Sequence, residues 1–442
     1  MNLCALNVVL LVLLMTDGNA ATSAPDPNLT REIRALIESA RGAPTVLCEY
    51  AARSLQNGWG WTDAPASPLG TRSRRIHKRQ MSAADIQFLL GSLDTPDPCV
   101  RELAVRLVAS VDREEVTTGL IQRLASSDSA IRVVAALGLG ISQPEKAVDP
   151  LIRATGDASS SVRANAVWAL GRIGDRRATA SVTRCLDDKS ALVRRTAAGA
   201  LGHLEATSAL PGLVRALQID REPQVRRVAA WAIVQVDDHG SAPDLAVALK
   251  KDSDAEVREM CAWGLGNLDD GSSSMAALIA AAKSDADEDV REAATWSLGE
   301  HGEASAAAVL GELVAHDASD EVRRTAAWGL GQLGLDSAPK GLIDAIASPD
   351  AEMRLTAAWA LSEIGDPAAL PALRTALSKE KNDRVRKAIL RALVHSGERA
   401  ERMSELLESK DPEVRKIAVQ AVAGKDGMDP WPWPQPRPRP FP

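Results

Sequence analysis

The chain has 442 residues, of which 45% are apolar and 25% are charged, a composition typical of a folded protein rather than a disordered one. Its formal net charge of −7 and its pI of about 5.6 argue against a general nucleic-acid binder. The aromatic content is uneven, with ten Trp against two Phe and one Tyr, so we expect Trp to have a particular role.

Residues 1–20 are typical of a signal peptide. The apolar run 8–15 precedes Gly18 and Ala20, small residues at the −3 and −1 positions of a cleavage site before Ala21. No basic residue precedes the run, which leaves a buried N-terminus as the alternative. We expect an exported protein, periplasmic or secreted, with no transmembrane segment because no apolar run reaches 18 residues.

Two further N-terminal parts precede the main body of the chain. Residues 21–57 are expected to form a helical cap, with Leu29, Ile33 and Ile37 on an apolar face. Residues 58–80 are a loop or linker that contains the basic cluster 72–79. That cluster is either a solvated linker, a site of attraction to an anionic surface or a site of proteolytic nicking.

An internal repeat occupies residues 81–427. A Val-Arg pair, with Ile or Met replacing Val twice, recurs eleven times at spacings of 29 to 33 residues. With the Val position as zero, a capping residue stands at −3 in nearly every copy, and Gly stands at +12 in five. Positions 0, +4, +7, +8 and +11 are mostly apolar and form one stripe of a helix. A second amphipathic helix fits the remaining residues, so the array predicts stacked helical pairs.

The shared register of cap, Val-Arg, Ala-Ala and Leu-Gly resembles the HEAT-like repeat family, in particular its short-repeat branch that also occurs in phycobilin lyases. The resemblance covers about residues 82–424 and implies an all-α fold, a right-handed α-solenoid of about eleven repeats. It also implies that the Arg at +1 pairs with acidic groups between repeats. The positions of this Arg ladder are Arg101, Arg132, Arg163, Arg194, Arg226, Arg258, Arg291, Arg323, Arg354, Arg386 and Arg415.

Position +6 holds a recurrent Trp, at Trp168, Trp231, Trp263, Trp296, Trp328 and Trp359, with Gly199 in the fourth repeat. On a helical wheel this position lies about 140° from the centre of the apolar stripe. The resemblance to the HEAT-like repeat family implies that the second helices, which carry these Trp, line the concave surface. Positions −1, +2, +3 and +10 share the side of +6 and are acid-rich in later repeats, at Glu256, Glu259, Asp289, Glu292, Glu300, Glu321, Glu352 and Glu363.

This Trp row predicts a groove for a protein partner or an extended peptide, cationic or Pro-rich, through ring stacking and cation–π contacts. A glycan or small ligand that stacks on the rings is one alternative. The other is purely structural, with the rings packed between neighbouring helices to rigidify the array.

The tail, residues 428–442, has Pro at every second position and is therefore expected to be extended. It carries Pro, Trp and Arg, which suggests the hypothesis that it docks in the groove of its own or a neighbouring chain. Cys48 and Cys99 are the candidate disulfide pair.

No enzyme signature is found. The match to GxGxxG at 329–334 lies in a repeat helix with no preceding strand, so it does not predict a nucleotide site. The six His form no metal-binding pattern. We therefore predict an exported, non-catalytic interaction scaffold with no cofactor and no metal; a lyase-type enzyme, implied by the family resemblance, is a further alternative. The oligomeric state is left open.

Overall fold

The computed structural model describes residues 27–42, 81–236, 239–268 and 272–398, with a few positions between 407 and 419. The chain divides into two compact units, Met1–Ala147 and Val148–Pro442. The predicted signal peptide, the basic linker and the tail lie outside the described residues. Across those described ranges the secondary structure is helical without a strand, and no helix there is long and apolar enough to cross a membrane.

The first unit begins with a helix that covers the end of the repeat array. Its helices are α2 (Pro27–Ala40), α5 (Ala83–Ser92), α6 (Pro98–Val108), α7 (Glu114–Arg123) and α8 (Ser129–Ser142). Helix α2 packs on α6 through the buried side chains of Leu29, Ile33 and Ile37. The Gly42 N–H donates to the Asp97 carboxylate at 3.0 Å. The predicted N-terminal cap is therefore helical up to Ala40 and is tied to the first repeat.

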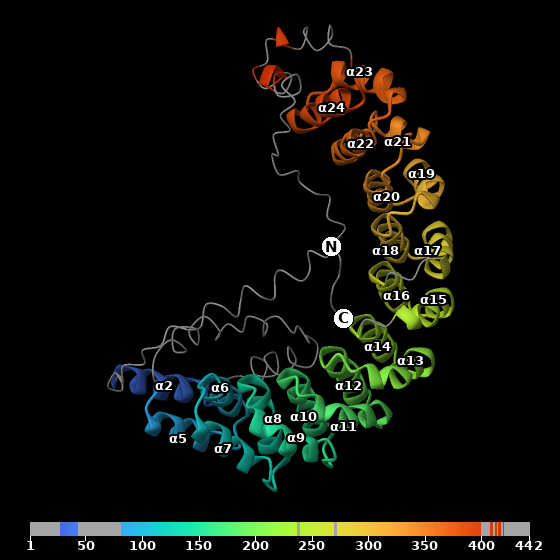
Figure 1. Cartoon of the computed structure of the whole chain (residues 1–442). Coiled ribbons are helices and arrows are strands. Elements are labelled where there is room, and N and C mark those ends of the chain that lie inside the picture. The colour runs from blue at the N-terminus through green and yellow to red at the C-terminus, as the bar shows by residue number, and fades with distance from the viewer. Residues whose placement is uncertain are drawn as a thin grey trace. The chain divides into compact units, whose positions relative to one another are not determined.

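The second unit consists of two rows of helices, which Figure 1 shows as an inner and an outer row. The inner row holds the Val-Arg helices α10 (Ser160–Ile173), α12 (Ala191–His203), α14 (Pro223–Gln235), α16 (Ala255–Asn267), α18 (Glu288–Glu300), α20 (Asp320–Gln332), α22 (Ala351–Ile364) and α24 (Asp383–His395). The outer row holds α9 (Val148–Ala154), α11 (Thr179–Arg184), α13 (Leu210–Ile219), α15 (Ala242–Lys251), α17 (Ser272–Ser284), α19 (Ala307–His316), α21 (Lys340–Ala345) and α23 (Leu370–Lys379).

Each Val-Arg helix begins at the predicted capping position. At −3, the side chains of Asp97, Asp128, Asp254, Asp287, Asp350 and Asn382 accept from first-turn amides. The capping residue makes no such bond in α10, α12, α14 and α20. In those four repeats an Asp at −5 accepts from the N–H of the capping residue instead, as Asp188 does from Ser190 at 2.8 Å. The turn before each of these helices is therefore closed by a side-chain oxygen in either case.

The core lies between the two rows. Val162, Ala166 and Leu170, at positions 0, +4 and +8 of α10, are completely buried. Each inner helix from α14 to α20 packs on the outer helix that precedes it and on its neighbours in the row. A single pair of helices would leave its apolar stripe in water, and stacking removes that surface at about 25 cal/mol per Å². The glycines at +12, such as Gly174 with φ +77°, end their helices in the left-handed conformation that glycine adopts without strain.

Candidate functional site on the second helices

Positions −1, +2, +3, +6 and +10 of helices α10 to α24 lie on one side of these helices, which we call the inner face. The Trp row at +6 is divided in its exposure. Trp231, Trp328 and Trp359 are buried, with 4%, 4% and 8% of their surface exposed. Trp168, Trp263 and Trp296 are partly exposed.

The buried rings lie against glycines of the preceding repeat. A Cβ atom on Gly202 would come within 2.6 Å of Cζ3 of Trp231, and one on Gly331 within 2.6 Å of Cζ3 of Trp359. Gly299 stands in the same relation to Trp328, at 2.9 Å. All three glycines are at +9, the Gly of the Leu-Gly pair, so the absence of a side chain at +9 makes room for the next repeat's indole.

The helical wheel of a single helix does not predict this burial at the three positions. It places +6 far from the stripe that faces the outer row, and that placement considers one helix alone. In a stack, each inner helix also covers the flank of its neighbour, so a side chain on the flank is buried without belonging to the stripe. For Trp231, Trp328 and Trp359 the geometry favours the structural alternative.

The partly exposed rings have different neighbours. The residue at +9 before Trp263 is Val234 rather than glycine, so the space that a glycine leaves for the indole is absent there. The glycine before Trp296, Gly266, faces Ser297, whose hydroxyl donates to the Ala262 carbonyl at 2.8 Å. The inner face thus retains partly exposed indoles on α16 and α18.

Carboxylates accompany these two indoles on the inner face. Glu256 is exposed, and Glu259, Asp289 and Glu292 are partly exposed, all on α16 and α18. The remaining acidic residues that the sequence assigns to the inner face, Glu300, Glu321, Glu352 and Glu363, are also exposed. Several of these groups form ion pairs, among them Glu256 with Arg227 at 2.7 Å, Glu352 with Arg384 at 3.5 Å, and Glu321 with Arg324.

The inner face of α10, α12 and α14 is basic instead. Arg172, Arg195 and Arg227 stand there, each partly buried, with His203 between them. Burial lowers the pKa of Arg172 and of Arg195 from the ordinary value. Burial, with a smaller contribution from the charge of Arg172, lowers the pKa of His203 to about 4, so this ring is neutral at pH 7.

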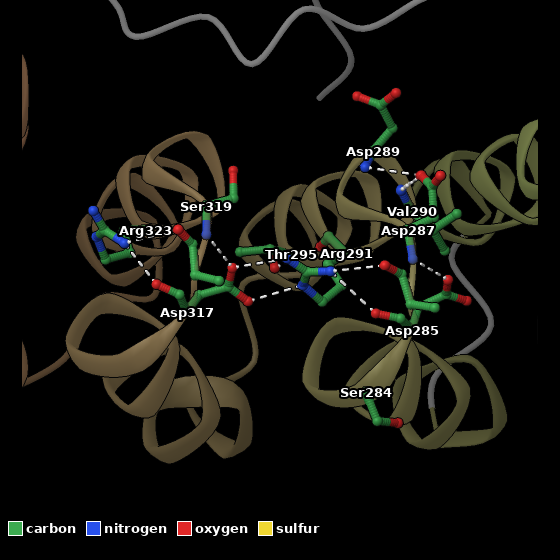
Figure 2. Close-up of polar contacts among 12 residues, drawn as sticks. Ser284, Asp285, Asp287, Asp289, Val290, Arg291, Thr295, Asp317, Ser319 and Arg323 are labelled. Carbon is green, nitrogen blue, oxygen red and sulfur yellow. Dashed lines mark hydrogen bonds and ion pairs between the residues drawn. The ribbon is translucent and has the colours of Figure 1, made fainter.

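The Arg ladder links one repeat to the next away from the inner face. Figure 2 shows one step: Nε and Nη2 of Arg291 donate to the two carboxylate oxygens of Asp317 at 2.9 and 3.0 Å, and Nη1 donates to the Asp285 carbonyl at 3.1 Å. The same Asp317 accepts from the N–H of Ser319. The ion pairs of this type are Arg163–Asp188, Arg194–Asp220, Arg226–Asp252, Arg258–Asp285, Arg291–Asp317 and Arg354–Glu380.

The other ladder positions show a backbone contact or a local ion pair. Arg101 donates to the Thr95 carbonyl and Arg132 to that of Ser126, six residues earlier in each case, as does Arg415 to Ser409. Arg323 contacts Asp320 and Arg386 contacts Asp383, within their own helices. At −5 of the repeats after Arg323 and Arg386 stand Ser348 and Ser409, which offer no carboxylate.

The partner acids at −5 are site residues that sequence reasoning missed. Burial raises the pKa of Asp188, Asp220, Asp252, Asp285 and Asp317, and the hydrogen bonds from Arg and from the turn amide outweigh it, so the pKa of each lies below its usual range. A signal was present, because an acidic residue recurs two places before the cap in consecutive repeats.

The three cysteines in the described part of the chain, Cys99, Cys185 and Cys261, are all buried. Cys99 is disulfide-bonded, and Cys48 lies outside the described residues, so the Cys48–Cys99 pair stays a prediction. Cys185 and Cys261 are free and buried. Among the described residues there is no group of three or more His, Cys, Asp and Glu that could hold a metal ion.

Comparisons with known proteins identify the repeat. The family model described as HEAT repeats matches residues 86–160, 117–198, 148–234, 184–266, 242–331 and 307–394. A search of curated protein sequences finds no match.

Solved structures with the same architecture include importin beta, 14% identical with a TM-score of 0.58 over 89% of this chain and 63% of that one. Kap95p, in a structure of its binding to RanGDP, is 13% identical with a TM-score of 0.53 over 91% and 65%. This chain thus spans less than two thirds of both. The complex of CpcE and CpcF of phycocyanin lyase from Nostoc sp. PCC7120 is 24% identical, with a TM-score of 0.34 over 51% and 91%.

These findings confirm the all-α solenoid and the repeat family that the Val-Arg register predicts. Solenoids of this kind offer extended surfaces that suit binding to proteins and peptides, and most are non-catalytic. The chain therefore belongs to the HEAT-repeat family.

Proposed function

We propose that the chain is an exported, non-catalytic scaffold that binds an extended cationic peptide of a protein partner on the inner face of α16 and α18. The observation that carries the proposal is the pairing of two partly exposed indoles, Trp263 and Trp296, with carboxylates on the same two helices. Export rests on residues 1–20 alone.

The chemistry of this surface suits Arg or Lys side chains in an extended chain. A guanidinium over an indole face gains about 0.5–1 kcal/mol at an exposed site and more when desolvated. Glu259 and Glu292, both at +2, and Asp289 at −1 supply the opposite charge. A Pro-rich backbone lowers the entropy lost on binding because it is already extended.

The test is a titration of the full chain with a fluorescein-labelled peptide of alternating Arg and Pro, followed by fluorescence anisotropy. We expect Glu259→Gln with Glu292→Gln to weaken binding roughly tenfold and to reduce its salt dependence. The matched control is Glu312→Gln with Asp344→Asn, which removes the same charge from exposed positions of the outer helices α19 and α21. Equal losses in the two double variants, or no binding by the unaltered chain, would refute the proposal.

A further inference from the structure

Five inner helices carry a Trp at +6 and follow another inner helix of the second unit. The rings on α14, α20 and α22 are buried, whereas those on α16 and α18 are partly exposed. Because all five rings occupy the same position of their helix, the difference must come from the contact with the preceding helix. The glycine contacts show that this contact joins +9 of one helix to +7 of the next.

Where the ring is buried, +9 is glycine and +7 is alanine or glycine. A Cβ on the glycine at +9 would lie 2.8 to 3.1 Å from the Cα atom at +7 of the next helix, so the two backbones are in close contact. The indole then covers the remaining space beside this contact. The three pairs are Gly202 with Ala232, Gly299 with Gly329, and Gly331 with Ala360.

At the junction of α16 and α18, Ser297 occupies the space that the indole fills elsewhere. The three atoms nearest to a Cβ on Gly266 all belong to Ser297, with Oγ the nearest, Cβ at 2.6 Å and Cα at 3.0 Å. At Gly202 and Gly331 the nearest atom is instead Cζ3 of the next repeat's indole, at 2.6 Å. The serine hydroxyl therefore stands in place of a ring atom.

A buried hydrogen bond holds Ser297 in that place. Its side chain is completely buried, and its hydroxyl donates to the Ala262 carbonyl of α16 at 2.8 Å. One turn later, Nε2 of His301 lies 3.0 Å from the Leu265 carbonyl oxygen of the same helix. Rotation of the serine away from Gly266 would leave its hydroxyl without this buried partner, which is unfavourable.

At the junction of α14 and α16 the obstructing side chain comes from the preceding helix. Position +9 is Val234 and position +7 is Gly264. A Cβ on Gly264 would lie 2.8 Å from Cγ2 of Val234. Val234 is buried, so its side chain fills the contact, and the Trp263 ring is left partly exposed.

We propose that Ser297 and Val234 are positioning residues that keep the Trp296 and Trp263 rings at the surface, and that they thereby determine where along the array a peptide binds. The role in binding rests on the function proposed above, because the peptide uses these two rings. The placement of the rings does not depend on it.

The test uses the full chain labelled with 5-fluorotryptophan. The ¹⁹F resonance of Trp296 is assigned by its loss in Trp296→Phe, and its shift on exchange of H2O for D2O reports the exposure of the ring. Ser297→Ala gives α18 the pair of residues found at the junction of α20 and α22, so this solvent shift should fall to that of a buried ring. Gly266→Val with Ser297→Gly gives it the pair found at the junction of α14 and α16, so the solvent shift should be retained.

The reciprocal variant keeps the test decisive if Ser297→Ala does not fold. Ala360→Ser places a hydroxyl beside Gly331, and the solvent shift of the Trp359 resonance should increase. A Trp296 ring that stays exposed in Ser297→Ala would overturn the proposal. So would a Trp359 ring that stays buried in Ala360→Ser.

Titration with the Arg-Pro peptide separates the placement of the rings from their use. Ser297→Ala should weaken binding about two- to fivefold, the loss expected for one exposed cation–π contact. Gly266→Val with Ser297→Gly should bind as the unaltered chain does. Unweakened binding by a chain in which Trp296 is buried would overturn the binding role of this ring, whereas the ¹⁹F measurement alone decides its placement.

Discussion

Replacing Gly331 by Ala tests whether the glycines at +9 leave the space that the indole of the next repeat occupies. A Cβ at this position would lie 2.6 and 2.8 Å from two atoms of the Trp359 ring and 3.1 Å from Cα of Ala360. Neither neighbour can yield easily, because the ring is buried and the Cα belongs to the backbone of α22. Overpacking of this kind costs about 1–3 kcal/mol, against a gain in helix propensity of about 1 kcal/mol.

We therefore expect Gly331→Ala to destabilise the junction of α20 and α22 by about 1–2 kcal/mol. Hydrogen exchange of the amides in these two helices is the measurement, because a repeat array need not unfold in one step. Gly91→Ala is the matched control. Gly91 is also inside a helix and has nothing within 4 Å of a Cβ, so the same change there should stabilise by about 0.5–1 kcal/mol.

The double variant isolates the ring. In a Trp359→Leu background the smaller side chain leaves room, and Gly331→Ala should lose most of its cost, a coupling of about 1 kcal/mol or more. The reasoning fails if Gly331→Ala slows hydrogen exchange in α20 and α22, as Gly91→Ala is expected to do in α5. It also fails if the cost is the same with and without the indole.

Three further predictions follow from the ion pairs, the buried imidazole and the thiols. Arg291→Met leaves the buried Asp317 carboxylate without its guanidinium and should lower the free energy of unfolding by denaturant by about 2–4 kcal/mol. Arg323→Met breaks no pair with another repeat and should lower it by less than about 1 kcal/mol. Equal losses in the two variants would contradict a stabilising role for the ion pairs between repeats. The folded pKa of His203, about 4, lies below the unfolded value near 6.5, so its contribution to stability is present above pH 6.5 and is lost as the pH falls towards 4. His203→Gln should flatten the pH dependence of the unfolding midpoint in that range, and an unchanged profile would count against it. Burial raises the pKa of the Cys185 thiol to about 11 and that of Cys261 further, so neither should react with iodoacetamide at pH 8 until the chain unfolds; rapid labelling of the folded chain would show that the thiols are accessible.

The repeat and its helix boundaries could be read from the sequence because they rest on local signals. The Asp or Asn at −3 and the glycine at +12 act within one turn of their helix, and the helices begin and end there. The period of the Val-Arg pair specifies which residues stack, since equivalent positions in neighbouring repeats must meet.

The use of the Trp row could not be read in the same way. Whether an indole at +6 is buried depends on side chains of neighbouring helices. Trp359 lies beside Gly331 and is buried, Trp263 follows Val234 and is partly exposed, and Trp296 is partly exposed although Gly266 precedes it, because Ser297 faces that glycine. A wheel drawn for one helix contains no information about those neighbours. The acids at −5 were missed for a similar reason, because their partner Arg belongs to the preceding repeat.

Acrylamide quenching of Trp fluorescence, with and without the Arg-Pro peptide, tests most directly whether the inner face of α16 and α18 binds a partner. The full chain is compared with Trp296→Phe, which removes a partly exposed ring, and with Trp328→Phe, which removes a buried one. We predict that the peptide protects part of the fluorescence from acrylamide, and that this protected part is reduced in Trp296→Phe and unchanged in Trp328→Phe. Equal protection in both variants, or none in the unaltered chain, would contradict the account.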